Sequence, residues 1–191
     1  EGAIPLIQEA RGRYRSISYR AGELNALGQL GTAYAARGEP QLAVAALDSA
    51  LAAARQLGQR SEEASEVEQL ASLHRESGDY RHALELFGAA RRLNQTLDQT
   101  VEVGNDLQSE AEIHAALGDL NTALRLAGDA LRLHQASASN NDELSDRLLL
   151  AELSARAGNR GETRSHLATA RQLAARADTR LARVEVALVD A

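Results

Sequence analysis

The 191-residue sequence has no cysteine, no lysine and no tryptophan, and only 3% of its residues are aromatic. The absence of cysteine excludes disulfides, thiolate catalysis and cysteine-based zinc sites. All basic residues are arginines, and they form no dense run in a chain whose formal net charge is −6, so nucleic-acid binding is not expected. No apolar stretch approaches the roughly 18–20 residues that span a bilayer, so no membrane partner is expected either.

Alanine and leucine supply most of the 44% hydrophobic content, which favours closely packed helices over sheets. A glycine followed by a polar residue recurs with a 40-residue period, at Gly38-Glu39, Gly78-Asp79, Gly118-Asp119 and Gly158-Asn159. Glycine adopts the left-handed conformation that closes a helix, and an acid or amide after it can cap the next helix. A fixed period of this size indicates a solenoid of stacked helical hairpins.

Apolar residues within each period follow helical spacing on two successive segments. The first segment carries Leu27, Leu30, Gly31 and Tyr34, and Pro40 suits the first position of the second. The predicted fold class is therefore all-α, with helices at about 3–17, 22–37, 40–57, 61–77, 80–96, 99–117, 120–137, 142–157 and 160–176, and another starting at 180.

The spacing Leu27-x2-Leu30-Gly31-x2-Tyr34, followed by Ala43-x3-Leu47, resembles the tetratricopeptide repeat (TPR), whose pattern is W-x2-L-G-x2-Y…A-x3-F. The tryptophan and the late proline of that pattern are absent. The usual repeat has about 34 residues, so the 40-residue period is similar to a longer variant of bacterial type. The resemblance implies a right-handed superhelical solenoid of antiparallel helix pairs.

We predict one TPR-like solenoid over residues 1–191, with about four full repeats and a half repeat at each end. Because Ala3, Ile7 and Ala10 match Ala43, Leu47 and Ala50, the chain begins in a second helix, and the start on Glu1 agrees with a missing N-terminus. The predicted boundaries are a truncated repeat at 1–20, full repeats at 21–59, 60–98, 99–138 and 139–178, and a further truncated repeat at 179–191.

Small residues recur where helices of adjacent hairpins are expected to cross closely, because only a small side chain permits a short interaxial distance. We predict that these four alanines are buried: Ala50, Ala90, Ala130 and Ala170.

No arrangement of residues predicts catalysis, a cofactor or a metal site. His74 and His114 occupy equivalent positions in successive repeats, too far apart to share a metal, and are interpreted as filler between helices. His82, His134 and His166 fall at different phases of second helices and are expected to face solvent. The carboxylates are scattered, and no serine or threonine has a histidine and an acid placed as a triad.

Two charged residues interrupt the apolar stripe of the first helices. Glu110 takes the place of Leu30 and Leu70, and Arg147 takes that of Leu27. One interpretation is a partly buried ion pair that bridges the third and fourth repeats and fixes their stagger. The other is that the array frays there and both side chains face water.

The resemblance also implies that the first helices line a concave face that binds a partner. The exposed positions of that face map onto Asn25, Gly28, Thr32, Ser65, Glu68, Ser72, Arg75, Asn105, Gln108, Glu112, Ser145, Leu148, Glu152 and Arg156. Helical phase independently places these positions away from the apolar stripe. Amides can bind an extended peptide backbone, and the glutamates favour a cationic segment. The polar residues can equally form an ordinary solvated helix face.

The leading functional interpretation is a non-catalytic protein- or peptide-binding scaffold that presents a preformed curved surface. Because bacterial repeat arrays of this longer type are often joined to caspase-like CHAT protease, signalling or DNA-binding domains, one alternative is a sensor or regulatory arm of a larger protein. Another is self-association through the open ends of the solenoid. The absence of a signal peptide or a membrane segment is interpreted as a cytoplasmic location.

Overall fold

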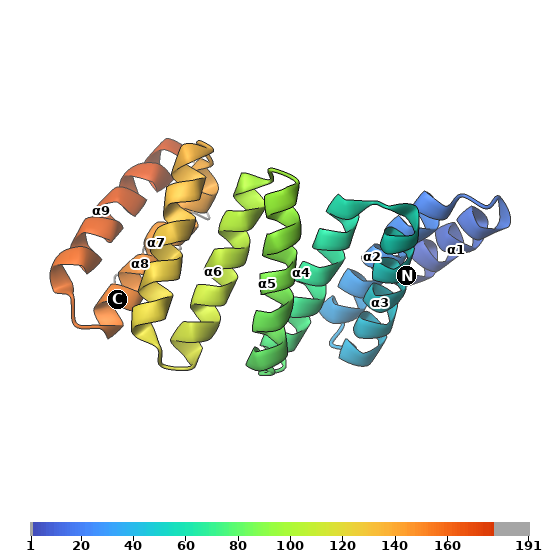
Figure 1. The fold of residues 1–191 in the computed structure, drawn as a ribbon, viewed down its shortest axis with the longest axis horizontal. Helices are drawn as coiled ribbons and strands as arrows, with labels where there is room; N and C mark the ends of the chain where they lie inside the picture. The colour runs from blue at the N-terminus through green and yellow to red at the C-terminus, as the bar shows by residue number, and fades with distance from the viewer. Residues whose placement is uncertain (1, 178–191) are drawn as a thin grey trace. The chain divides into compact units, whose positions relative to one another are not determined.

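The computed structural model describes residues 2–177, and these residues form nine α-helices and no strand (Figure 1). The helices are α1 (Ala3–Ser16), α2 (Arg20–Ala36), α3 (Pro40–Leu57), α4 (Arg60–Glu76), α5 (Tyr80–Thr96), α6 (Thr100–Ala116), α7 (Leu120–Ala136), α8 (Asn140–Arg156) and α9 (Arg160–Ala177). Each predicted helix is present, and its ends differ from the predicted ones only slightly. The helix predicted from residue 180 lies outside the described residues.

The helices divide into two compact units, Glu1–Leu97 with α1 to α5 and Asp98–Ala191 with α6 to α9. In the first unit α2 packs on α3 and α4 on α5, and in the second α6 packs on α7 and α8 on α9. The predicted all-α architecture of consecutive helix pairs is confirmed (Figure 1). A single solenoid over the whole chain stays a prediction.

The corners between helices recur twice as often as the glycine pattern suggests. At the four predicted corners Gly38, Gly78, Gly118 and Gly158 have φ of 73°, 80°, 84° and 79°. Halfway between them, Ser18, Gly58, Asp98 and Ala138 adopt the same left-handed conformation, with φ of 58°, 68°, 55° and 54°. The predicted helix ends place a corner at each of these positions, but their left-handed conformation is not predicted, because three of the four residues are not glycine.

The predicted helix caps form at the two aspartates. The Asp79 carboxylate accepts a hydrogen bond from the His82 backbone N–H at 3.4 Å, and that of Asp119 from the Thr122 N–H at 3.2 Å. Glu39 instead forms an ion pair with Arg37 at 2.7 Å. A glutamate therefore does not replace the shorter aspartate as a cap here, and α3 begins with Pro40 at a position where a missing N–H costs little.

The core of each unit is built from alanine and leucine in the helix interfaces. Ala50, Ala90, Ala130 and Ala170, which the sequence predicts to be buried, are all 0% exposed. In the second unit Leu126, Leu131 and Leu153 belong to one apolar cluster formed by α6, α7 and α8. None of the helices between residues 2 and 177 combines the length and the hydrophobicity needed to cross a bilayer.

Two of the three histidines predicted to face solvent, His134 and His166, do not. His134 is 0% exposed, and its Nδ1 lies 2.6 Å from Oδ2 of the buried Asp146. Room for the imidazole exists because Gly104 has no Cβ; a Cβ there would lie 2.3 Å from His134 Nε2. Burial raises the pKa of Asp146 to about 6, although its contact with His134 acts in the opposite direction. His166 is half-buried and not solvated, because it packs beside Arg147, whereas His82 is exposed as predicted.

The two charged residues that interrupt the apolar stripe, Glu110 and Arg147, do not both face water. Glu110 is only 7% exposed and Arg147 is half-buried, so the interpretation in which both side chains face water is wrong. Arg147 forms an ion pair with Glu143, one turn earlier on α8, at 3.1 Å. The bridge between Glu110 and Arg147 stays a prediction.

Candidate binding ridge on the first helices

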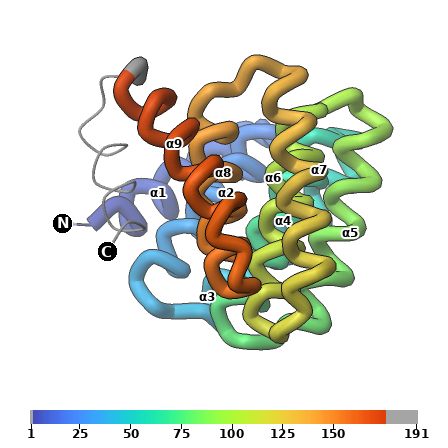
Figure 2. Tube along the Cα trace, turned by 90° about the vertical axis from the view of Figure 1, so that its left-hand side faces the viewer, coloured from blue at the N-terminus to red at the C-terminus, as the bar shows by residue number. Residues whose placement is uncertain are grey.

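The predicted partner-binding residues lie on α2 and α4 of the first unit and on α6 and α8 of the second, and we call this set without Gly28 the binding ridge. Contacts between α2 and α4, and between α6 and α8, make these helices neighbours within each unit. In the second unit α7 lies beside α6 (Figure 2). No residue of the ridge is buried. Four at one repeat position, Asn25, Ser65, Asn105 and Ser145, are exposed, whereas Gly28 is buried.

Two hollows lie along the ridge in the first unit. The first, of about 300 Å³, brings Asn25, Thr32 and Ser65 together, and the second, of about 310 Å³, brings Thr32 together with Glu68 and Ser72. Thr32 belongs to both, and its hydroxyl donates a hydrogen bond to Gln69 Oε1 at 2.7 Å. The structure therefore gathers five of the six ridge residues of this unit around two adjoining depressions.

The charge of these hollows has one sign. Glu62 and Glu66 line the first, and Glu68 and Glu76 line the second. Among the described residues, no arginine or histidine lines either hollow. Apolar side chains, among them Leu47 and Leu73, complete the second hollow. This combination suits a ligand that has positive charge and some apolar surface.

Glu66 is a residue of this site that the sequence analysis does not identify. It is 5% exposed and packs against Gly28, where an added Cβ would lie 2.5 Å from Glu66 Oε1. Gln69 Nε2 donates a hydrogen bond to its Oε2 at 3.4 Å. Burial raises the pKa of Glu66 to about 7, so the carboxyl changes charge near neutral pH.

Aligning the repeats with one another would have identified the buried carboxyl group of Glu66 from the sequence. Glu66, Asp106 and Asp146 occupy the same position in three successive repeats, where the first repeat has Ala26. All three acids are buried in the structure. An acid that recurs at a position held elsewhere by alanine indicates a carboxyl group inside the helix interface.

In the second unit several ridge side chains form hydrogen bonds, ion pairs or apolar contacts with other residues of the same unit. Arg156 Nη2 donates a hydrogen bond to the Ala115 carbonyl at 2.6 Å, which ties the end of α8 to α6. Its Nη1 lies 3.5 Å from Glu152 Oε1. Leu148 packs against the apolar cluster of α8 and α9. The α2 and α4 part of the ridge is therefore the stronger candidate for binding a partner.

A further hollow of about 450 Å³ has the opposite charge. It lies between α1, α2 and α3 and is lined by Arg11, Arg15 and Arg20 together with Glu23. Glu23 forms ion pairs with Arg11 at 3.5 Å and with Arg15 at 3.1 Å. Because these ion pairs partly neutralise the positive charge of the hollow, it is a weaker candidate for a binding site than the ridge on α2 and α4.

No protein-family model matches the chain, and no curated protein matches it. Solved structures do match. One is a Podosopora anserina putative kinesin light chain with nearly identical TPR-like repeats, which is 19% identical with a TM-score of 0.70 over 92% of this chain and 87% of that one. The fold is of the tetratricopeptide-repeat type.

Two further solved structures share this TPR-like fold. Aspartyl phosphate phosphatase F from Bacillus subtilis has a TM-score of 0.91 at 11% identity, over 98% of this chain and 49% of that one. BtubC from P. vanneervenii has a TM-score of 0.76 at 16% identity, over 90% of this chain and 74% of that one. The chain thus spans about half the length of the phosphatase. At such identities the likeness concerns the fold alone.

Proposed function

We propose that the protein is a non-catalytic scaffold that binds an extended, positively charged segment of a partner protein along α2 and α4. The observation that carries the proposal is the pair of adjoining hollows lined by Glu62, Glu66, Glu68 and Glu76 and by no basic side chain of the described residues. Carboxylates on a rigid surface attract a cationic segment and raise its association rate.

Hydrogen bonding supports the same kind of ligand. The exposed Asn25 and Gln29 beside the first hollow have amides that can both donate to and accept from a peptide backbone, whatever its sequence. Each ion pair at an exposed site contributes only about 0.2–1 kcal/mol, so we expect specificity to come from several contacts along the ridge. Phosphatase activity is not proposed, because likeness to the phosphatase extends to the fold alone.

The test uses a library of short fluorescent peptides of basic, neutral and acidic composition, with binding followed by fluorescence polarisation. We expect basic peptides to bind and their affinity to fall with added salt, because salt screens exposed charges. Ser65→Arg and Ser72→Arg place a positive charge beside the hollows and are expected to weaken binding by about 10-fold or more.

Gln41→Arg is the matched control, since it adds the same charge at an exposed position of α3. If this control weakens binding as much as the ridge variants do, net charge and not the ridge determines the affinity. A preference for acidic peptides would contradict the proposal of a cationic partner. Unchanged binding by both ridge variants would remove α2 and α4 as the site.

The second candidate function is that of a regulatory arm of a larger protein. It is supported by the chain matching only 49% and 51% of two solved chains with which it shares the fold, aspartyl phosphate phosphatase F and RapI. The flanking sequence tests this directly, because a fused catalytic or DNA-binding domain would be visible there. Self-association and a cytoplasmic location stay proposals, to be tested by light scattering at several concentrations and by cell fractionation.

A further inference from the structure

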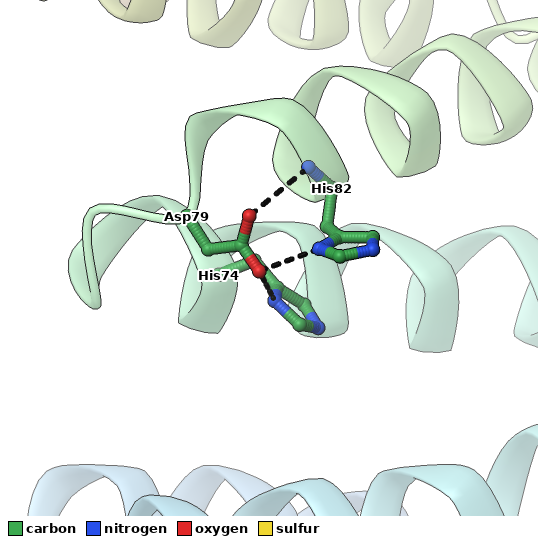
Figure 3. Close-up of side chains that lie close together, drawn as sticks. All are labelled: His74, Asp79 and His82. Atoms are coloured by element: carbon green, nitrogen blue, oxygen red, sulfur yellow. Dashed lines mark hydrogen bonds and ion pairs between the residues drawn. The ribbon is translucent and has the colours of Figure 1, made fainter.

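The corner between α4 and α5 gathers three potential metal ligands. His74 lies in the last turn of α4, Asp79 is the cap of α5, and His82 lies in the first turn of α5. Asp79 Oδ2 lies 3.2 Å from His74 Nδ1 and 2.6 Å from His82 Nδ1. Figure 3 shows both imidazole rings beside the same carboxylate oxygen, one ring from each helix.

We propose that this corner is a binding site for a divalent transition-metal ion such as Zn²⁺, with His74, Asp79 and His82 as its ligands. One ligand atom from each of the three residues can be chosen so that all lie within 4.8 Å of one another. Zinc binds imidazole nitrogen and carboxylate oxygen at about 2.0–2.2 Å, which places the ligand atoms of a tetrahedral site about 3.3–3.5 Å apart. The pair of His74 and Asp79 is already near that spacing, and His82 would need to withdraw by about 0.7 Å to reach it.

The local backbone holds the carboxylate in place for this role. Asp79 Oδ1 accepts the capping bond from the His82 N–H, which fixes the group and leaves Oδ2 turned toward the two rings. The positive end of α5 disfavours a cation here, whereas the negative end of α4, where His74 lies, favours it.

Exposure of the site leaves room for a further ligand. The side chains of His74, Asp79 and His82 are 33%, 39% and 57% exposed, so solvent reaches all three. A zinc site with three protein ligands leaves its fourth position to water or to a donor from another molecule. We therefore expect the bound ion to remain accessible from solvent and not to be enclosed as a structural ion.

The other repeats provide natural comparisons. The three proposed ligands occupy positions that recur in each of the four repeats. The combination of two histidines and an aspartate occurs only at the α4–α5 corner. The equivalent residues are Tyr34, Glu39 and Leu42 in the first repeat, His114, Asp119 and Thr122 in the third, and Ser154, Asn159 and Glu162 in the fourth. In the third repeat His114 Nδ1 lies 3.4 Å from Asp119 Oδ2, so this corner has two of the three ligands.

This proposal replaces the prediction from sequence that no metal site exists. That prediction compares His74 with His114 across repeats and does not compare His74 with His82 across one corner. The two histidines lie on different helices, and their ring centres are 5.5 Å apart. Only the antiparallel turn at Gly78 brings them together.

The experiment is a titration of the chain, free of any histidine tag, with ZnCl₂ by calorimetry and with CoCl₂ by visible absorption. We expect one ion per chain with micromolar affinity, and cobalt bands typical of a four-coordinate site with nitrogen and oxygen ligands. His82→Thr copies the third repeat and is expected to weaken binding by about 10-fold or more, as is Asp79→Asn.

Thr122→His is the matched gain-of-function variant, since it completes the ligand set at the α6–α7 corner. We expect it to raise the stoichiometry from one ion per chain to two. Circular dichroism of every variant checks that the helices are retained. His74→Gln, which leaves the capping carboxylate in place, keeps the test valid if Asp79→Asn unfolds.

Two results would overturn the proposal. The first is the absence of zinc binding by the folded wild-type chain at micromolar concentrations. The second is binding whose affinity is unchanged in both His82→Thr and His74→Gln, which would place the ion elsewhere. Both readouts are independent of peptide binding, so they leave the proposed function of the ridge untouched.

Discussion

The buried carboxyl group of Glu66 makes the stability of the first unit depend on pH in a direction that can be calculated. Burial against Gly28 raises its pKa from 4.5 to about 7. In the unfolded chain the group loses its proton near pH 4.5, whereas in the folded chain it keeps that proton until about pH 7. Between these values the folded state binds more protons, so stability falls as the pH rises through this window.

The magnitude follows from the same two pKa values. A difference of about 2.5 between them corresponds to about 3 kcal/mol of unfolding free energy, which is present below pH 4.5 and lost above pH 7. Glu66→Gln removes the ionisation while retaining the size of the protonated side chain. We expect it to raise stability by about 1 kcal/mol or less at pH 5, where the unfolded-state carboxyl is already partly ionised, and by about 3 kcal/mol at pH 8.

Urea unfolding followed by far-UV circular dichroism at pH 5 and pH 8 measures this effect. Comparing the variant with the wild type at each pH cancels the contributions of the other titrating groups. Glu85→Gln, which removes an exposed carboxylate paired with Arg81, is the control and is expected to have a small and similar effect at both values. An equal change for Glu66→Gln at pH 5 and pH 8 would refute the reasoning.

The remaining predictions concern glycine and core positions and are tested by urea unfolding. Ala138→Gly is expected to stabilise the chain by about 1 kcal/mol and Gly118→Ala to destabilise it by a similar amount, because both positions have φ above 50°; effects of the same sign would contradict this. Gly104→Ala is expected to cost about 1–3 kcal/mol, since its new Cβ meets His134, and a neutral result would show that the ring can move freely. Phe87→Ala, which empties a site only 2% exposed, is expected to cost about 3–5 kcal/mol, and a loss below about 1 kcal/mol would mean that neighbouring side chains refill it.

The repeat architecture could be predicted because its signals are local. Helical spacing of Leu27, Leu30 and Tyr34 depends on residues within two turns, and the left-handed conformation at Gly38 depends on a single residue. The same reasoning fails at Ala138, where an alanine adopts a conformation that glycine usually supplies. A left-handed backbone at an alanine is unfavourable by about 1–2 kcal/mol, so residue type alone does not predict it there.

The burial and the pKa values of the titratable side chains could be predicted less well, because they depend on residues that are distant in the sequence. The sequence predicts that His134 faces solvent. In the structure it is buried, because it packs against Gly104 of the preceding helix and contacts Asp146. Glu66 reads as one of many solvated acids, and its pKa is raised only because α2 lies against it. The ridge residues needed less context, since the outward side of a helix follows from its phase.

The sequence by itself determined that the chain forms helical hairpins with a 40-residue period, because helix phase and glycine corners are encoded within a few neighbouring residues. Only the tertiary structure decided which acids lose water, which histidines are enclosed, and that His74, Asp79 and His82 converge on one corner. Those outcomes depend on the packing of one helix against another, and desolvation and ligand geometry arise only where side chains from separate helices meet.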